Sequence, residues 1–127
     1  MALSRRERRS PLDPQTRRDF YDLHALLCKA LADPKRLLII NALRDQPKTV
    51  GELTAELELS QSNTSQHLSI LRDRGVVRAT RRGNNVAYSL RDMRVLEAVD
   101  LFRAVTAASP GEDSPIRRSV PAPRRRS

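Results

Sequence analysis

The sequence predicts a mainly α-helical domain that carries one small β-hairpin, and three observations support this fold class. Apolar residues recur at helical spacing through most of residues 16–108. One stretch, VVRATRRGNNVAYSL at residues 76–90, interrupts this pattern with alternating apolar and polar residues. The flanking segments 1–15 and 109–127 are rich in Pro, Ser and Arg, and we expect them to be disordered basic tails.

The first two helices are predicted by apolar spacing and by the residues that separate them. The stretch QTRRDFYDLHALLCKALAD places Phe20, Leu23, Leu27 and Leu31 on one side of a helix. A second helix, PKRLLIINALRD, follows directly, because the preceding aspartate can cap it and proline is tolerated at its first position. The residues expected to be mostly buried in this helix are Leu37, Ile40, Ala42 and Leu43.

Two shorter helices come next and form a helix-turn-helix pattern. Thr49 and Glu52 have the spacing of a capping box at the start of the helix VGELTAELE. After a break of two or three residues, Ser60 can cap a helix that begins at Gln61 and that Gly75 is placed to end. Two short helices joined by a tight connection are typical of DNA-binding helix-turn-helix domains.

The second helix of this pair combines an apolar back with an uncharged polar front. Thr64, Leu68 and Leu71 share one face and can pack on the preceding helices. Small amides and hydroxyls can enter a major groove and match base-edge donors and acceptors, whereas a carboxylate would repel the phosphates. The alternative is an ordinary solvent-exposed helix that is rich in serine. The polar residues that lie mainly away from the back are Ser62, Asn63, Ser65, Gln66 and Ser69.

The hairpin and a last helix complete the domain. Arg78, Arg81 and Arg82 gather near a turn, RGNN, with Asn84 and Asn85 at its tip, where Gly and Asn can take positive φ. This composition is typical of a wing that lies against a minor groove or the phosphate backbone. The alternative is a solvated hairpin whose charges protect its edge. The last helix begins near Asp92 and carries Met93, Leu96, Val99, Phe102 and Val105 at steps of three. The complete prediction is a winged helix-turn-helix of five helices plus a two-stranded wing.

The formal charge of +9 favours an anionic partner, nucleic acid first and a membrane surface second. Most of the excess lies toward the ends of the chain, because residues 1–18 hold six Arg against two acidic residues and residues 109–127 hold five against two. No apolar run approaches the ~18 residues of a membrane span, and no apolar region follows the basic N-terminus as in a secretory signal. One cysteine excludes an intramolecular disulfide framework, so we expect a reduced, cytoplasmic protein without membrane partners.

Residues 20–105 resemble the ArsR/SmtB family of bacterial winged-helix repressors. The segments that carry the resemblance are ALADPKRLLII, VGELTAELELSQSNTSQHLSILRDRGVV and RRGNNVAYSL. The resemblance implies a homodimer built from the first and last helices, which binds a palindromic operator and releases it when an inducer binds. Gln66 replaces a second His that is common in the family. The DNA-contacting positions that the resemblance implies are Gln61, Ser62, Ser65, Gln66 and His67, with the wing arginines on the backbone.

The sensory side departs from the family pattern. Many members bind metal or arsenite through Cys-x-Cys in the helix that here reads ELTAELE, where the corresponding residues are Thr54 and Glu56. Other members bind metal through His and carboxylates on the last helix. The last helix predicted here has no His and offers only Asp92, Glu97 and Asp100.

One other pair could hold a metal. His24 and Cys28 are four apart on the first helix, and two copies at a dimer axis would assemble a His2Cys2 set suited to zinc or nickel. The alternative readings of Cys28 are a small buried hydrophobe or an intermolecular disulfide.

These observations predict a DNA-binding transcriptional regulator, specifically a homodimeric repressor that senses a metal ion or another small molecule. The alternative is a winged-helix module that contacts protein or RNA without sensing an inducer. We predict no enzymatic activity, because His24, Cys28 and His67 offer no base–nucleophile–orienter set, and four glycines include no phosphate-binding loop.

Overall fold

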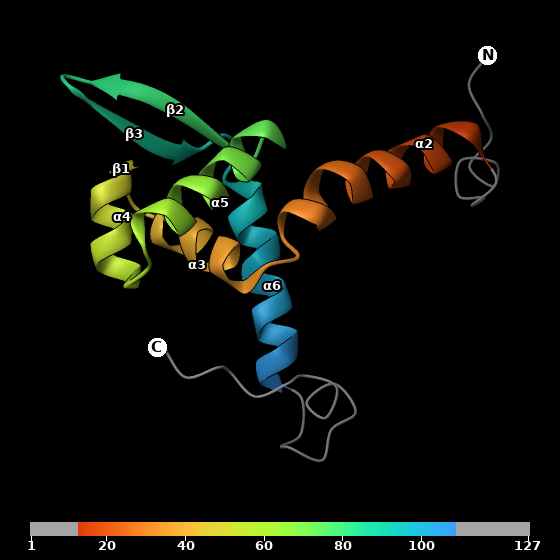
Figure 1. The fold of residues 1–127 in the computed structure, drawn as a ribbon. Coiled ribbons are helices and arrows are strands. Elements are labelled where there is room, and N and C mark those ends of the chain that lie inside the picture. Colours follow the sequence, from red (N-terminus) through yellow and green to blue (C-terminus); the bar gives the residue numbers. More distant parts are fainter. Residues whose placement is uncertain (1–12, 109–127) are drawn as a thin grey trace. The chain divides into compact units, whose positions relative to one another are not determined.

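The structure, a computed structural model, describes residues 13–108 (Figure 1). The chain divides into two units, which are described separately. The first unit ends at Asp92, and the second contains a single described helix, α6 (Arg94–Ala108). Most of both predicted tails lies outside the described residues, but α2 begins at Pro14, inside the predicted tail 1–15. The first unit contains, in chain order, α2 (Pro14–Asp22), the π-helical segment η1 (Leu23–Cys28), α3 (Pro34–Ala42), β1 (Lys48–Thr49), α4 (Val50–Leu57), α5 (Gln61–Asp73), β2 (Val77–Arg82) and β3 (Asn85–Leu90).

The predicted winged helix-turn-helix class is confirmed, and the helices begin at the expected caps. The Asp33 carboxylate accepts a hydrogen bond from the Lys35 amide at 2.7 Å at the start of α3. At the start of α4, the capping box of Thr49 and Glu52 has both of its hydrogen bonds, at 3.2 and 3.0 Å. Each cap satisfies amides that the first helical turn leaves without partners.

The first helix, defined here as α2, η1 and the helical residues Lys29 and Ala30 that follow, differs from the prediction in two ways. It was predicted as one regular α-helix, but residues 23–28 form a π-helical segment. Apolar spacing did not distinguish the two, because residues four apart stay close to one face in either form. Its predicted buried side is also not buried, since neither α2 nor η1 contains a buried residue. Phe20 is 64% exposed and Leu23 is 43% exposed, whereas Leu27 and Leu31 are partly buried.

The wing contains one strand more than the two predicted. β2 and β3 pair antiparallel from Val77 opposite Leu90 to Arg82 opposite Asn85, and β1 adds to the other edge of β3. A two-residue strand that runs directly into the cap of α4 is too short for an alternating pattern to reveal. At the hairpin turn Gly83 has φ of 60°, whereas the two asparagines predicted to share this freedom do not take positive φ.

The core of the first unit lies between α3, α4, α5 and the sheet. The burial of Ile40, Ala42 and Leu43 is confirmed, and Ile39, which the spacing did not single out, is fully buried as well. Leu37 is only partly buried. The other apolar residues of this core are Ala30, Leu53, Leu68, Leu71, Val76, Val77, Ala87 and Leu90.

In the second unit, α6 buries Leu96 and Val99 near its start. Its later apolar residues remain exposed, with Phe102 at 69% and Val105 at 58%. Among the described residues, no helix combines the length and apolarity that crossing a membrane requires.

Candidate nucleic-acid interface

The connection between α4 and α5 sets where the predicted DNA-contacting helix begins. Glu58, at the end of α4, has φ of 55° and ψ of 43°, a left-handed conformation that ends the helix. Two residues later Ser60 caps α5, and its hydroxyl oxygen accepts from the Asn63 amide at 3.1 Å. The tight connection and the cap that the sequence predicted are therefore both present.

A pair of threonines holds the two helices of the motif together. Thr64 is fully buried, and its hydroxyl donates to the Ser60 carbonyl at 2.8 Å. The Thr54 hydroxyl on α4 in turn donates to the Thr64 oxygen at 3.2 Å. Because a buried polar group without partners is costly, these bonds fix α5 against α4 at its first turn.

The two faces of α5 divide as the sequence predicted. Thr64, Leu68 and Leu71 are each 0% exposed, which confirms the buried back. No charged residue occurs on α5 before Arg72, so the outer face of its first turns is polar and neutral. Of the predicted DNA-contacting positions on this helix, the exposed ones are Gln61, Ser62, Ser65 and Gln66, and the partly buried ones are Asn63 and His67.

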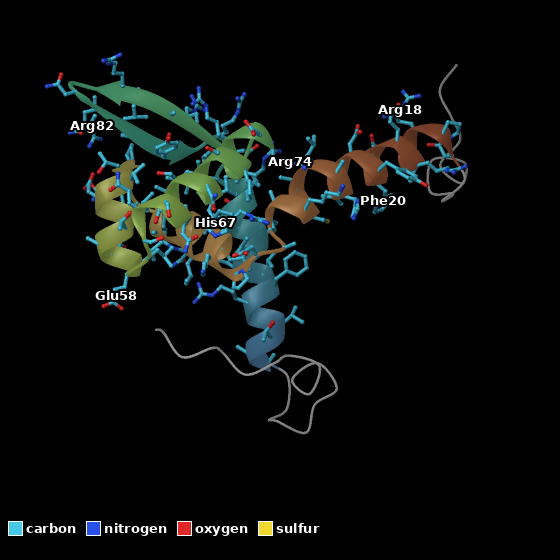
Figure 2. All side chains as sticks on the ribbon, in the orientation of Figure 1. Arg18, Phe20, Glu58, His67, Arg74 and Arg82 are labelled. Carbon is cyan, nitrogen blue, oxygen red and sulfur yellow. The ribbon has the colours of Figure 1, made fainter. Side chains whose placement is uncertain are left out.

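His67, labelled in Figure 2, differs from its neighbours on α5 because its ring contacts a side chain of another helix. Its Nδ1 lies 3.3 Å from Nη1 of Arg36 on α3. Partial burial lowers the pKa of His67 below its ordinary value, the Asp33 carboxylate opposes this shift, and the cations Arg36 and Lys35 add to it. The environment therefore favours the neutral imidazole.

The wing presents the predicted polar residues to solvent. Its five predicted contact residues are all exposed: Arg78, Arg81, Arg82, Asn84 and Asn85. Arg78 Nη2 donates to the Arg91 carbonyl at 3.4 Å. Arg82 lies close enough to Glu52 to help lower the pKa of that carboxyl, although the hydrogen bonds from Thr49 have the larger effect. The wing thus carries positive charge beside a neutral helix face, so the two elements can make different kinds of DNA contact.

The positions of the family's Cys-x-Cys site are occupied by side chains with other partners. Thr54 donates to Thr64, and the Glu56 carboxylate accepts from Lys48 Nζ at 2.5 Å. Neither residue type is a soft-metal ligand, so these residues do not fit a thiolate metal site. On α6, the Asp100 carboxylate accepts from Arg103 at 3.4 Å.

His24 and Cys28, the other metal candidates, both lie on η1 and are exposed. The interpretation of Cys28 as a small buried hydrophobe is wrong, because the described residues leave its side chain exposed. Within residues 13–108, no group of three or more His, Cys, Asp and Glu side chains could hold a metal.

Sequence reasoning missed two arginines that contact the first helix. Arg36 donates to backbone carbonyls at the end of that helix and also contacts His67. Arg74 Nη1 donates to the Ala25 carbonyl at 2.5 Å. The Arg36–His67 contact spans 31 positions and the Arg74–Ala25 contact spans 49, and no residue pattern encodes contacts between such distant positions.

Comparisons with known proteins agree with this architecture. A model of the family described as bacterial regulatory protein, arsR family, matches residues 33–79. The HTH-type transcriptional regulator CmtR of Mycobacterium tuberculosis is 45% identical over 84 residues, covering 65% of this chain and 71% of that protein. The transcriptional activator HlyU of Vibrio cholerae is 42% identical over 77 residues, covering 61% and 71%. Among solved structures, the homodimeric winged helix-turn-helix DNA-binding domain of Mb0332 from Mycobacterium bovis is 25% identical, with a TM-score of 0.64 over 72% of this chain and 84% of that one.

Proposed function

The chain belongs to the arsR family of bacterial regulatory proteins and is a DNA-binding transcriptional regulator. From this premise, we propose that it acts as a homodimeric repressor, which releases a palindromic operator when an inducer binds. It is not an enzyme. The observation that carries the proposal is the neutral, exposed face of α5 beside an arginine-bearing wing.

We assign base contacts to α5 and backbone contacts to the wing. Amides and hydroxyls at the start of a helix in the major groove can match base edges, and Gln66 can make two bonds to an adenine edge. Arg78, Arg81 and Arg82 would neutralise phosphates or enter a minor groove. The remaining proposed DNA contacts are Gln61, Ser62, Asn63, Ser65, Asn84 and Asn85.

Dimerisation is supported by apolar surface that is exposed within the described part of the chain. The first helix exposes Phe20, Tyr21 and Leu26, and α6 exposes Leu101 and Phe102. Contiguous apolar patches on soluble domains mark interaction sites, and the Mb0332 domain is homodimeric. We propose that a second copy covers these faces, which would present two α5 helices to the two halves of a palindrome.

The sign of regulation and the inducer belong to the same proposal. HlyU is named a transcriptional activator, so activation is the second candidate, and a promoter-fusion reporter in cells with and without the chain distinguishes the two. The inducer would be a metal ion or another small molecule. A zinc or nickel site could use His24 and Cys28 from two copies, whereas Thr54 and Glu56 supply no thiolate and already have other partners.

The test of the proposal compares Gln66→Ala with Arg82→Ala in the full chain. A duplex selected by the wild-type chain from a random pool serves as the probe, with point-substituted and shuffled duplexes as references. We expect Gln66→Ala to lose about 1–3 kcal/mol of discrimination at one base-pair position. Arg82→Ala should weaken binding to all duplexes similarly and reduce the slope of log K against log salt by about 1.

Two results would contradict the assignment. If both variants lose affinity equally for selected and shuffled duplexes, the assignment of base contacts to α5 and backbone contacts to the wing is wrong. If the wild-type chain selects no duplex, the module that contacts protein or RNA becomes the better reading.

A further inference from the structure

We propose that Arg36 is a positioning residue, which joins the end of the first helix to His67 and so fixes the orientation in which α5 presents its polar face. This inference rests on the proposed DNA-binding function and deepens it. It also changes the role of His67 from a base-contacting residue to the residue of α5 that receives the Arg36 contact.

The guanidinium of Arg36 bonds three groups from two parts of the chain. Its Nε donates to the Ala30 carbonyl at 2.6 Å, and its Nη2 donates to the Lys29 carbonyl at 3.1 Å. Its Nη1 contacts His67 Nδ1 at 3.3 Å. A guanidinium is a planar fork of donors, so bonds in three directions hold its plane in one place.

The chemistry of the pair determines the direction of the bond. Arg36 is permanently protonated and has no acceptor, so Nδ1 of His67 must accept. His67 therefore carries its proton on Nε2 in this arrangement. A protonated imidazole has hydrogens on both nitrogens and cannot make this contact.

The Arg36 contact lies between two others along α5. Thr64, in the first turn, bonds to Thr54 on α4, and Arg74, directly after the helix, bonds to the Ala25 carbonyl. The buried leucines set the depth of α5 in the core but leave its polar rim to be fixed by such directional bonds. Since the contacts from Arg36 and Arg74 both reach the first helix, α5 takes its orientation partly from that helix.

The amides Asn and Gln can distinguish this role from direct base contact. The side-chain oxygen of Asn can occupy the place of His Nδ1, whereas the terminal group of Gln reaches the place of Nε2. We expect His67→Asn to retain the ratio of affinities for selected over shuffled duplex within about threefold. His67→Gln and Arg36→Met should each lower that ratio about tenfold. The double variant His67→Gln/Arg36→Met should be no worse than either single variant, because both remove the same contact.

A spectroscopic measurement on the wild-type full chain keeps the inference testable should a variant fail to fold. Nitrogen-15 NMR of the imidazole at neutral pH should show His67 with Nδ1 unprotonated and Nε2 protonated. A proton on Nδ1 would overturn the inference. An affinity ratio for His67→Gln as high as that for His67→Asn would also overturn it, as would additive losses of that ratio in the double variant. If the wild-type chain selects no duplex, the proposed function fails and this inference fails with it. If the wild-type chain does select a duplex, then equal performance of His67→Gln and His67→Asn, or additive losses in the double variant, overturns this inference and leaves the proposed function standing.

Discussion

The first helix and α5 have similar apolar spacing and opposite burial. On α5, Leu68 and Leu71 are fully buried within the chain, whereas on the first helix Phe20 and Leu26 remain largely exposed. An apolar stripe therefore indicates which side of a helix seeks a partner but not whether that partner belongs to the same chain. The comparison predicts that substitutions on α5 affect folding of the single chain, and that those on the first helix affect assembly.

The largest effect is expected for Leu68→Ala. This side chain is fully buried in the core, so its loss leaves a cavity and should lower the free energy of unfolding by about 3 kcal/mol. Urea denaturation followed by circular dichroism measures the change. Ser69→Ala, next to it and exposed, is the matched control and should change stability by less than about 0.5 kcal/mol. A loss below about 1 kcal/mol for Leu68→Ala would show that α5 is not held by its buried back.

The second effect concerns the first helix, where Leu26→Glu should disrupt the proposed dimer. A charge placed in an apolar interface must be desolvated, so the dissociation constant should rise about a hundredfold or more. Sedimentation equilibrium measures it, and Arg18→Ala on the same helix is the control. A dimer that is unaffected by Leu26→Glu would mean that the exposed side of this helix is not the interface.

The same contrast explains how much could be predicted from sequence. Sequence patterns predicted features that depend on residues close together in the chain, such as the capping box of Thr49 and Glu52 and the buried back of α5. They did not predict contacts and burial that depend on residues far apart in the chain. The Arg36–His67 contact spans 31 positions, and the exposure of Cys28 depends on what covers its helix. Base-contacting residues could be proposed from their chemistry, but His67 shares that chemistry and faces Arg36.

A third, smaller effect is expected in the connection that positions α5. Glu58 takes a left-handed conformation, which is unfavourable for a residue with a Cβ and readily adopted by glycine. Glu58→Gly should therefore raise the free energy of unfolding by about 0.5 kcal/mol, after the greater entropy of the unfolded glycine is allowed for. Ala55→Gly, within α4, should instead lower it by about 1 kcal/mol. Urea denaturation compares both variants, and a destabilised Glu58→Gly would show that its side chain matters more than its backbone.

The smallest effect is a pH dependence that originates at His67. Its pKa lies below the ordinary value of about 6.5, chiefly because partial burial disfavours the charged ring. As the pH falls below that value, the unfolded chain takes up a proton before the folded chain does, so stability decreases until the folded pKa is passed. Above about pH 6.5 both states are neutral at this residue, and its contribution is fully present.

Urea denaturation at a series of pH values measures this slope. In the His24→Asn variant, His67 is the sole histidine of the chain, which isolates its titration. Adding His67→Asn to that variant should remove the part of the slope that lies just below pH 6.5, since an amide does not titrate. Because Asp33 opposes the shift and Arg36 and Lys35 increase it, Asp33→Asn should extend the decrease to lower pH. An unchanged slope after His67→Asn would mean that this ring is as accessible to protons in the folded chain as in the unfolded one.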